Sequence, residues 1–397
     1  MSSRLSNEIN FTQFSNIVNG EKCGSSILSK GLNPSTKEKL WDVPIASVHD
    51  LDKAVASAKH GRQLWLNTTV HERQVALKSC ANALLSLREE MAHILMQECG
   101  KPRSFALLEV EHAAGFLNYY SREEPPAEEV IQDHENLRLT LRYIPVGIVG
   151  AICPWNFPLV LSVAKIGSAL LTGNPIIVKP SPYSPYTTLK FAELVQNFLP
   201  PGVLQALNGD NDFGAAMVTH LDIPKISFTG STDTGRRIMA SASQDLKNLT
   251  LELGGNDAAI ICNDVNIDEV AREVAIGTFF NSGQMCLASK RIYIHRDIFE
   301  EFVQKMVSIV ESWAGGDGPE ENLLLGPIQN EMQYAVVKRI FDDCVSNEYK
   351  FALKGGPATG YGLFFYPSIV EAPPDSSLIV TGEQFGKYYP TQFSAIQ

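Results

Sequence analysis

The sequence predicts an α/β protein built on a doubly wound parallel sheet. Two observations lead to this expectation. From Tyr143 onward, short strand-like runs alternate with helix-like runs. Several strand-like runs are almost continuously apolar, which is typical of strands that helices cover on both faces. The chain of 397 residues is long enough for two domains with a sizeable core.

The elements before and within this alternating region can be placed in order. Apolar residues recur at helical spacing in two early segments, 51–64 and 70–96. Residues 123–142 begin rich in proline and acid and then alternate as LRLTLR, which favours a strand segment. The expected strands of the main sheet are 144–152, 176–179, 203–207, 225–230 and 248–253. The expected helices between them are 159–171, 187–198, 213–218 and one that begins after Ser231.

The pattern restarts after Asp264, and we expect the domain boundary near Leu253-Gly254-Gly255, where a strand leaves the first sheet and a second domain begins. Its first half contains a helix at 267–280, the loop that holds Cys286, and a strand at 291–295. The remaining expected strands are 258–262, FALKG (351–355) and LFFYPSIV (363–370), and the remaining helices are 298–313 and 330–344.

Composition and charge exclude several classes of function. Asp and Glu outnumber Lys and Arg by 44 to 33, giving a formal net charge of −11, so the chain lacks the basic excess of a nucleic-acid binder. Its seven cysteines are scattered without a CxxC pair, which argues against a zinc site or a disulfide framework and favours a reducing compartment. We therefore expect no metal and no nucleic-acid partner.

One apolar stretch, 143–178, is long enough to be considered as a membrane span. Pro154 and Pro158 interrupt it, and Lys165 lies in its second half. It reads better as a strand, a turn, a helix and another strand. The first residues, MSSRLSNEIN, have neither a signal-peptide core nor an Arg-rich amphipathic pattern. The expected location is the cytoplasm, without membrane contact.

Four polar positions outside the Cys286 loop could carry chemistry. Gly230-Ser231 opens a helix after a strand, which suits a pyrophosphate, although an ordinary helix capped by Ser231 or Thr232 explains it equally. Lys179 stands at the carboxyl end of a strand, where doubly wound sheets bind ligands, but a solvated lysine is the commoner case.

The other two positions are a carboxylate and an amide. Glu252 lies in an apolar run, where burial would raise its pKa and make it a general base, or where backbone donors could simply satisfy it. Asn156, among aromatics and prolines, offers an amide donor for an oxyanion or is merely a turn residue. Cys286 follows Glu252 by 34 residues. Each feature is ambiguous by itself, whereas their order along one chain is hard to obtain by chance.

The sequence resembles the aldehyde dehydrogenase superfamily from about Asn33 to Phe385. The matching stretches are PWNFPL (154–159), GNPIIVKPS (173–181), FTGSTDTG (228–235), LELGG (251–255) and NSGQMC (281–286). In this resemblance Cys286 matches the nucleophile, Glu252 the general base and Asn156 the oxyanion donor. The positions that match contacts to NAD or NADP are Ile152, Trp155, Lys179, Ser181, Pro182, Gly209, Gly230, Ser231, Gly235, Leu253, Gly254, Glu383 and Phe385.

The resemblance implies an aldehyde dehydrogenase-like fold with a Rossmann-type cofactor domain and an α/β catalytic domain. It assigns 1–122 and 143–253 to the NAD(P)-binding domain, 123–142 to an oligomerisation strand segment, and 254–386 to the catalytic domain. The implied reaction oxidises an aldehyde to a carboxylic acid through a cysteine thiohemiacetal and thioester. An uncharged substrate is expected, next to residues around Phe116, Tyr120, Trp155, Met285 and Leu287.

The sequence departs from the family pattern in two places. Pro182 stands where many NAD-preferring members have a glutamate, which leaves NAD and NADP both open. After Gly386 the tail 387–397, KYYPTQFSAIQ, does not resemble the family, so we expect the C-terminal part of the fold to be missing. Family members form homo-oligomers, and the altered end places self-association in question here.

The altered end also motivates an alternative to the active enzyme. In it, the chain is an inactive relative that at most binds a dinucleotide or a partner chain. A third hypothesis, transfer of the acyl group to coenzyme A, is disfavoured by the presence of Glu252, which would activate water.

Overall fold

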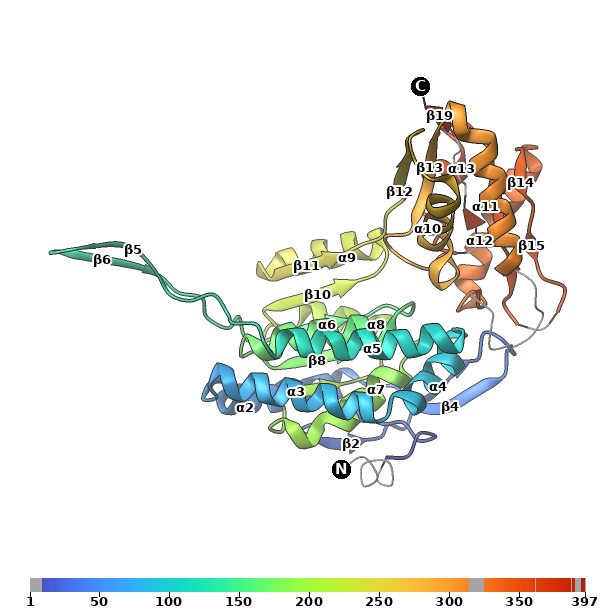
Figure 1. Ribbon diagram of the computed structural model, residues 1–397. Helices are drawn as coiled ribbons and strands as arrows, with labels where there is room; N and C mark the ends of the chain where they lie inside the picture. The colour runs from blue at the N-terminus through green and yellow to red at the C-terminus, as the bar shows by residue number, and fades with distance from the viewer. Residues whose placement is uncertain (1–8, 314–324, 361, 387, 390–393, 397) are drawn as a thin grey trace. The chain divides into compact units, whose positions relative to one another are not determined.

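The computed structural model describes residues 9–313, 325–360, 362–386, 388–389 and 394–396 (Figure 1). The chain forms two compact units, which we describe separately. The first comprises Met1–Gly31, Trp41–Ile94 and Leu107–Glu252, and the second comprises Leu32–Leu40, Leu95–Ala106 and Leu253–Gln397.

Two early segments, 32–40 and 95–106, group with the second unit, whereas the sequence-based division placed them in the first domain. Hydrogen bonds explain the grouping. Asn33 donates to Gln97 Oε1 at 3.0 Å, and the side chain of Gln329 donates to the carbonyl of Glu98 at 2.9 Å. Short-range sequence patterns contain no information about bonds between residues so far apart in the chain.

The first unit is built on a seven-stranded sheet in the order β11-β10-β7-β8-β9-β1-β2. Strands β11, β10, β7, β8 and β9 run parallel to one another, and β1 is antiparallel to both β9 and β2. This arrangement confirms the predicted doubly wound parallel sheet. The strands are β1 (Asn16–Val18), β2 (Glu21–Cys23), β7 (Val149–Ile152), β8 (Ile176–Lys179), β9 (Leu204–Ala206), β10 (Lys225–Thr229) and β11 (Asn248–Glu252).

The helices of the first unit form two groups. α3, α6 and α7 pack on one another, and α8 packs on α2 and α9. Members of both groups also contact strands of the sheet, so both of its faces are covered. The helices are α2 (Val48–Leu66), α3 (Val70–Ser86), α4 (Arg88–Cys99), α5 (Arg103–Tyr120), α6 (Pro158–Leu171), α7 (Tyr186–Val195), α8 (Asn211–Thr219) and α9 (Thr232–Ala242), with single turns η1 (Gln196–Phe198) and η2 (Ser243–Asp245). The ends of α4 and α5 nearest Gly100 belong to the second unit.

Burial explains why the central strands could be read from the sequence. Ile176, Ile177 and Val178 of β8 are fully buried, and each such side chain contributes about 1.5–3 kcal/mol when removed from water. The first predicted strand, 144–152, is shorter than expected, because only Val149–Ile152 is a strand. Pro145 and Gly147, with a positive φ of 114°, break the extended run before it.

Residues 123–142 contain two strands where one was expected. β5 (Glu129–His134) and β6 (Leu137–Leu141) pair antiparallel and project from the helices of the first unit as a thin ribbon (Figure 1). Apart from the half-buried Thr140, the residues of both strands are exposed. The alternation of LRLTLR therefore does not reflect a buried face within this unit. A short pair, β3 (Leu28–Leu32) and β4 (Lys39–Pro44), lies earlier in the chain.

The second unit contains two three-stranded sheets, ordered β12-β13-β19 and β14-β17-β18, and a short β15-β16 pair. The predicted run 363–370 is divided at Pro367 into two strands. Residues of the segment 387–397 supply β18 and β19, and the rest of that segment lies outside the described residues. The strands are β12 (Asp257–Ile261), β13 (Ser289–His295), β14 (Phe351–Leu353), β15 (Gly356–Pro357), β16 (Phe365–Tyr366), β17 (Ser368–Val370), β18 (Tyr388–Tyr389) and β19 (Ser394–Ile396).

Two apolar clusters form the core of this unit. One lies between α10, α11 and β13 and includes Phe279, Ile292 and Phe302. The other surrounds α12 and includes Val337 and Phe365. The helices are α10 (Ile267–Phe279), α11 (Phe299–Trp313), α12 (Glu331–Ser346) and α13 (Leu378–Thr381), with single turns η3 (Phe280–Gly283) and η4 (Arg296–Ile298). Within the part of the chain that the structure describes, no helix combines the length and apolarity that crossing a membrane requires.

Candidate active site

The residues expected to act together are divided between the two units. The first holds Ile152, Trp155, Asn156, Lys179, Ser181, Pro182, Gly209, Gly230, Ser231, Gly235 and Glu252. The second holds Leu253, Gly254, Cys286, Glu383 and Phe385. Each group is described within its own unit.

The carboxyl ends of four parallel strands align in the first unit. Ile152 is the register partner of both Lys179 and Phe228, and Thr229 is the partner of Glu252. β7 lies between β8 and β10: the chain proceeds from β7 to β8 and β9 on one side, and then crosses to β10 and β11 on the other. Such a switch point is where open α/β sheets bind ligands. The structure therefore brings the predicted strand-end residues of this unit to one edge.

Lys179 is a buried lysine at this edge, with 5% of its surface exposed. Burial lowers its pKa to about 8, and the neighbouring Cys153 and Asp210 oppose the shift. Its ammonium donates to the carbonyl of Pro180 at 3.3 Å, the one hydrogen bond it makes among the described residues. Two of its three donor hydrogens therefore remain for a ligand.

Ser231 caps α9 at the same edge. Its hydroxyl accepts from the backbone N–H of Thr234 at 3.4 Å, which confirms the predicted N-cap. The first amides of the helix and its dipole favour an anion. Asp233, in the first turn, is turned into solvent and pairs with Arg236 at 3.1 Å. Beside this helix, the buried Thr229 hydroxyl has no hydrogen-bond partner within the described part of the chain.

Asn156 is buried in the turn between β7 and α6, with 4% of its surface exposed. The helix that follows begins at Pro158, and its amides at Leu159 and Val160 donate to the Glu109 carboxylate at 3.0 and 3.2 Å. Glu109 thus fixes the start of α6 directly after the Asn156 turn. Sequence analysis missed Glu109, because a glutamate in a long helix-like run looks like any solvated residue.

Glu252 does not fit the expectation of a desolvated carboxylate, since its side chain is exposed within the first unit. The physical reason is that β11 is the edge strand of the sheet and only one neighbour covers it. Its backbone is nevertheless fixed, because the N–H of Gly230 donates to the Glu252 carbonyl at 3.0 Å.

A second residue that sequence analysis did not assign, Lys165, lies within electrostatic reach of Glu252. Burial lowers the pKa of Lys165, while the neighbouring Cys153 and Glu252 raise it. Its ammonium donates to Ser227 Oγ at 3.1 Å. In the sequence, Lys165 is the one charged residue of an apolar helix, and this indicated only that the segment does not span a membrane.

Cys286 follows a strained loop in the second unit. Asn281 and Ser282 adopt left-handed backbone with φ of 52° and 56°, at a typical cost of about 1–3 kcal/mol each. Buried side-chain bonds offset this strain. Ser282 Oγ donates to the carbonyl of Gly326 at 2.8 Å, and Gln284 Oε1 accepts from the backbone N–H of Gln329 at 2.8 Å. The half-buried Cys286 therefore emerges from a rigid segment.

Glu383, Gly254 and Cys286 meet around another lysine, Lys290. Its ammonium donates to the carbonyl of Gly255 at 2.7 Å and to that of Cys286 at 3.3 Å. The Glu383 carboxylate lies directly against Gly254, where any added Cβ would collide with it. Burial raises the pKa of Glu383, and Lys290 opposes the rise. Phe385 follows with left-handed backbone, φ 46°.

The residues expected to line the substrate pocket have mixed environments. In the first unit Phe116 is 41% exposed, whereas the ring of Tyr120 packs against Gly167. In the second unit Met285 packs on the apolar core, and Leu287 is 62% exposed. Tyr120 and Met285 thus pack within their own units, and their place beside a substrate stays a prediction.

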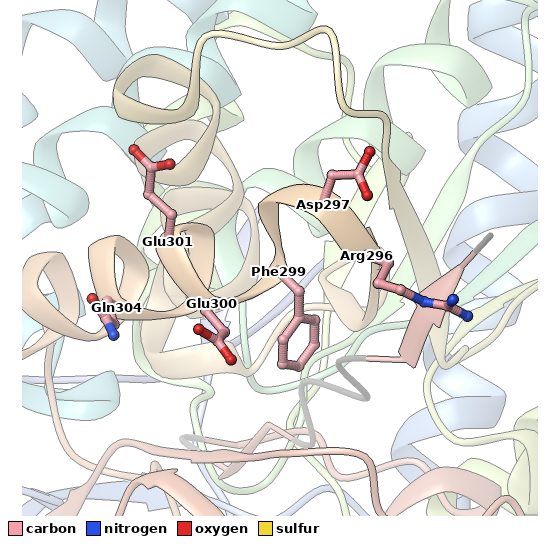
Figure 2. Close-up of a pocket in the computed structure, with 6 residues that line it drawn as sticks. All are labelled: Arg296, Asp297, Phe299, Glu300, Glu301 and Gln304. Atoms are coloured by element: carbon pink, nitrogen blue, oxygen red, sulfur yellow. The ribbon is translucent and has the colours of Figure 1, made fainter.

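Two hollows lie elsewhere in the units. One, of about 530 Å³, opens at the start of α11 and is lined by Arg296, Asp297, Phe299, Glu300, Glu301 and Gln304 (Figure 2). The other, of about 720 Å³, adjoins the amino ends of β7 and β10 in the first unit. None of the predicted site residues lines either one. Within the described residues, no three His, Cys, Asp or Glu side chains gather as metal ligands would.

Comparison with known proteins decides the family. The family model described as "Aldehyde dehydrogenase family" matches residues 24–388. The chain belongs to this family. Among curated relatives, the aldehyde dehydrogenase LUC3 of Fusarium is 41% identical over 382 residues, which cover 95% of this chain and 80% of that protein.

Solved structures of aldehyde dehydrogenases share the fold. The NAD⁺ complex of an aldehyde dehydrogenase from Bacillus cereus matches with a TM-score of 0.92 and 31% identity, covering 97% of this chain and 80% of that one. An Escherichia coli NADP-dependent enzyme matches with a TM-score of 0.94 and 28% identity, covering 98% and 82%. As an aldehyde dehydrogenase, this protein is an enzyme that uses NAD or NADP.

The residues of the first unit fit a dinucleotide. Lys179 has donor hydrogens to spare, the Thr229 hydroxyl is buried without a partner among the described residues, and α9 directs its amino end to the same edge. These groups suit ribose hydroxyls and a pyrophosphate.

Proposed function

We propose that this enzyme oxidises an uncharged aldehyde to its carboxylic acid through a covalent intermediate on Cys286. The observation that carries the proposal is the Cys286 loop, in which two strained residues and a set of buried hydrogen bonds hold one half-buried thiol. Strain of this kind persists where the surrounding structure over-determines it, and it clusters at active sites. Packing alone would not require it.

In the proposed mechanism, the Cys286 thiolate attacks the aldehyde carbon and forms a thiohemiacetal. The amide of Asn156 donates to the oxyanion, and burial strengthens that bond. The bound nicotinamide supplies the hydride acceptor that makes the oxidation to a thioester possible. Glu252 then takes a proton from water, which attacks the thioester and releases the acid and the thiol.

The remaining assignments follow from the same proposal. Lys179, Ser181, Gly209 and the start of α9 would hold the adenosine and pyrophosphate portions, while Glu383 and Phe385 would hold the nicotinamide ribose and ring. Trp155, Ile152, Gly235, Leu253 and Gly254 would shape the surrounding backbone. The first unit thereby acts as the cofactor domain and the second as the catalytic domain.

The β5–β6 ribbon supports self-association, because Val130, Ile131 and Leu139 on it are all at least 45% exposed. We also propose a cytoplasmic location, which the scattered cysteines support.

The test of the mechanism is Cys286→Ala with a panel of uncharged aldehydes and either dinucleotide. Reduced nicotinamide should no longer form, while circular dichroism remains that of the parent. Cys262→Ala is the matched control, since Cys262 is an exposed thiol of the same unit. Turnover that survives in Cys286→Ala would refute the assignment of the nucleophile.

The exposure of Glu252 favours a second candidate, a protein that binds dinucleotide without turnover. This candidate would be established if NADH quenched the fluorescence of the folded parent protein while no aldehyde gave a product. Acid formation that disappears in Glu252→Gln would exclude it.

A further inference from the structure

Lys290 is a fully buried lysine to which sequence analysis assigned no role. It is the extra residue of a β-bulge, because Asp257 pairs with Ser289 whereas Ala258 pairs with Arg291. A bulge changes the direction of a side chain, and bulges recur beside active sites. Here the lysine bonds the carbonyls of Gly255 and Cys286 at 2.7 and 3.3 Å. It therefore ties the Cys286 loop to the segment that enters β12.

Four titratable groups face one another around this bulge: Lys290, Glu383, Asp257 and Cys286. Burial lowers the pKa of Lys290, and the charges of the other three raise it. Burial raises the pKa of Glu383, Lys290 and a hydrogen bond from the backbone N–H of Gly255 lower it, and Asp257 raises it. Gly255 thus contacts both side chains, since its carbonyl accepts from Lys290. The other nearby cation, Arg291, is directed to the Asn256 carbonyl at 2.7 Å. Lys290 is thus the cation that offsets the burial of Glu383.

A purely structural anchor would not need this charge. An uncharged amide side chain can donate to carbonyl oxygens, and it avoids the cost of several kcal/mol of burying an ammonium. The lysine nevertheless occupies a position where all of its surface is covered. What an amide could not supply is a positive charge beside the Glu383 carboxylate.

We propose that Lys290 is a positioning residue that fastens the Cys286 loop to Gly255 and keeps Glu383 ionised for ligand binding. The second role rests on the proposed function, in which Glu383 accepts hydrogen bonds from a ribose. The carboxylate offers both of its oxygens, with a negative charge, to the two hydroxyls of a diol, whereas the protonated acid turns one of them into a donor and loses the charge. Lys290 thereby sets the lowest pH at which the dinucleotide binds fully.

The direct test is to titrate the Glu383 carboxyl by ¹³C NMR of glutamate-labelled protein, with its resonance assigned by its loss in Glu383→Gln. Lys290→Gln keeps donors for the two carbonyls but removes the charge. We expect the titration midpoint of Glu383 to rise by about one pH unit in this variant, as for other carboxylates that lose a neighbouring cation. Lys305→Gln is the control, since Lys305 pairs with Asp268 on the surface of the same unit. An unchanged midpoint in Lys290→Gln overturns the proposal.

The functional readout is the Kd for NADH measured by fluorescence between pH 5 and 9, without substrate. In the parent protein, affinity should fall as the pH drops and Glu383 takes up a proton. In Lys290→Gln the fall should begin about one unit higher, and in Glu383→Gln it should be absent. If no form binds NADH, the proposed function fails while the NMR titration still decides the role of Lys290.

A structural effect alone is distinguishable from the proposed one. Loss of packing in Lys290→Gln would weaken binding equally at every pH, without moving the midpoint, and that result would overturn the electrostatic role. Should this variant fail to fold, Lys290→Met is a second neutral replacement, with Lys290→Arg as its charge-retaining counterpart. Equal Glu383 midpoints in these two variants would likewise contradict the proposal.

Discussion

The two halves of the candidate site are built differently. At the carboxyl edge of the first unit, regular elements end together, and the groups offered to a ligand are strand-end side chains and the first amides of a helix. In the second unit, Cys286 follows left-handed residues that buried side chains hold in place. The first half therefore depends on backbone regularity, whereas the second depends on a few individual hydrogen bonds. Single substitutions should consequently have larger effects in the second half.

The largest effect is expected for Gln284→Leu. The Gln284 amide bonds the carbonyls of Asn281 and Pro327 and accepts from Gln329, and leucine would leave these buried groups unpaired. We expect a loss of about 3 kcal/mol in the free energy of unfolding, measured by urea denaturation. Gln304→Leu on the exposed side of α11 should change it by less than about 0.5 kcal/mol. A loss below about 1 kcal/mol in Gln284→Leu would show that the loop does not need this anchor.

Lys179→Met should weaken NADH binding by about 10- to 100-fold, because a charge-assisted bond contributes about 1.5–3 kcal/mol. Lys225→Met serves as the control, since Lys225 bonds Asn248 and Thr250 at the opposite, amino end of the same sheet. Fluorescence titration of both variants measures the difference. Equal losses in the two variants would mean that the carboxyl edge is not the dinucleotide site.

The pH dependence of NADH binding should reflect Lys179. Its pKa is lowered to about 8, so the ammonium is present at pH 7 and is lost as the pH rises through that value. Affinity should fall by roughly tenfold between pH 7 and pH 9, a change of about 1.4 kcal/mol. Lys179→Met should show a flat profile over this range. A parent profile that is itself flat would exclude contact between the ammonium and the ligand.

Pro182→Glu should shift the choice between the two dinucleotides. Pro182 is exposed next to the buried Ser181, and a carboxylate there would accept from ribose hydroxyls but repel a 2′-phosphate. We expect the ratio of the Kd values for NADP and NAD to rise about tenfold, a difference of about 1.4 kcal/mol. Pro182→Gln controls for the loss of proline. An equal ratio of these Kd values in both variants would show that the charge of the glutamate does not cause the shift.

Two helix caps provide the smallest contrast. Ser231→Ala and Asn266→Ala each remove an N-cap, of α9 and α10, and should each cost about 1 kcal/mol of stability. Only Ser231→Ala should also weaken NADH binding, by no more than a few-fold, because the helix amides themselves remain. Calorimetry and fluorescence titration measure the two effects. A greater binding loss in Asn266→Ala would reverse the assignment of the units.

The sequence predicted the regular half well for a physical reason. Strands such as β8 are covered on both faces, so their continuous apolar letters indicate both the strand and its end at Lys179. The positions of Ser231 and Gly230 follow from local capping rules. Glu252 was misjudged because its neighbours in sequence are apolar, although its strand lies at the edge of the sheet. Edge position is a property of topology and is not encoded in a short segment.

The second half was less predictable. The residues NSGQ (281–284) pointed to this loop only through the family resemblance. No neighbouring residue in the sequence indicates that Ser282 bonds Gly326 or that Gln284 bonds Gln329. Lys290 reads as one more charged residue at the start of a strand, although it lies on the same buried face of β13 as Ile292 and Ile294. Patterns of period 2 or 3.6 report which face of an element is covered, not which distant carbonyl a side chain will meet.

Residues 95–106 belong to the second unit although the stretches on both sides of them belong to the first. This arrangement affects how the chain folds during synthesis. On the ribosome, Glu98 emerges long before Gln329, its hydrogen-bond partner 231 residues later in the chain. At a synthesis rate of about 5–20 residues per second, that interval is roughly 10–50 s. During this interval, the ends of α4 and α5 nearest Gly100 are exposed, because the residues that will cover them have not yet been synthesised. Nascent chains at this stage should be strong chaperone clients, and a stop codon before residue 325 should yield insoluble product rather than a free cofactor-binding fragment.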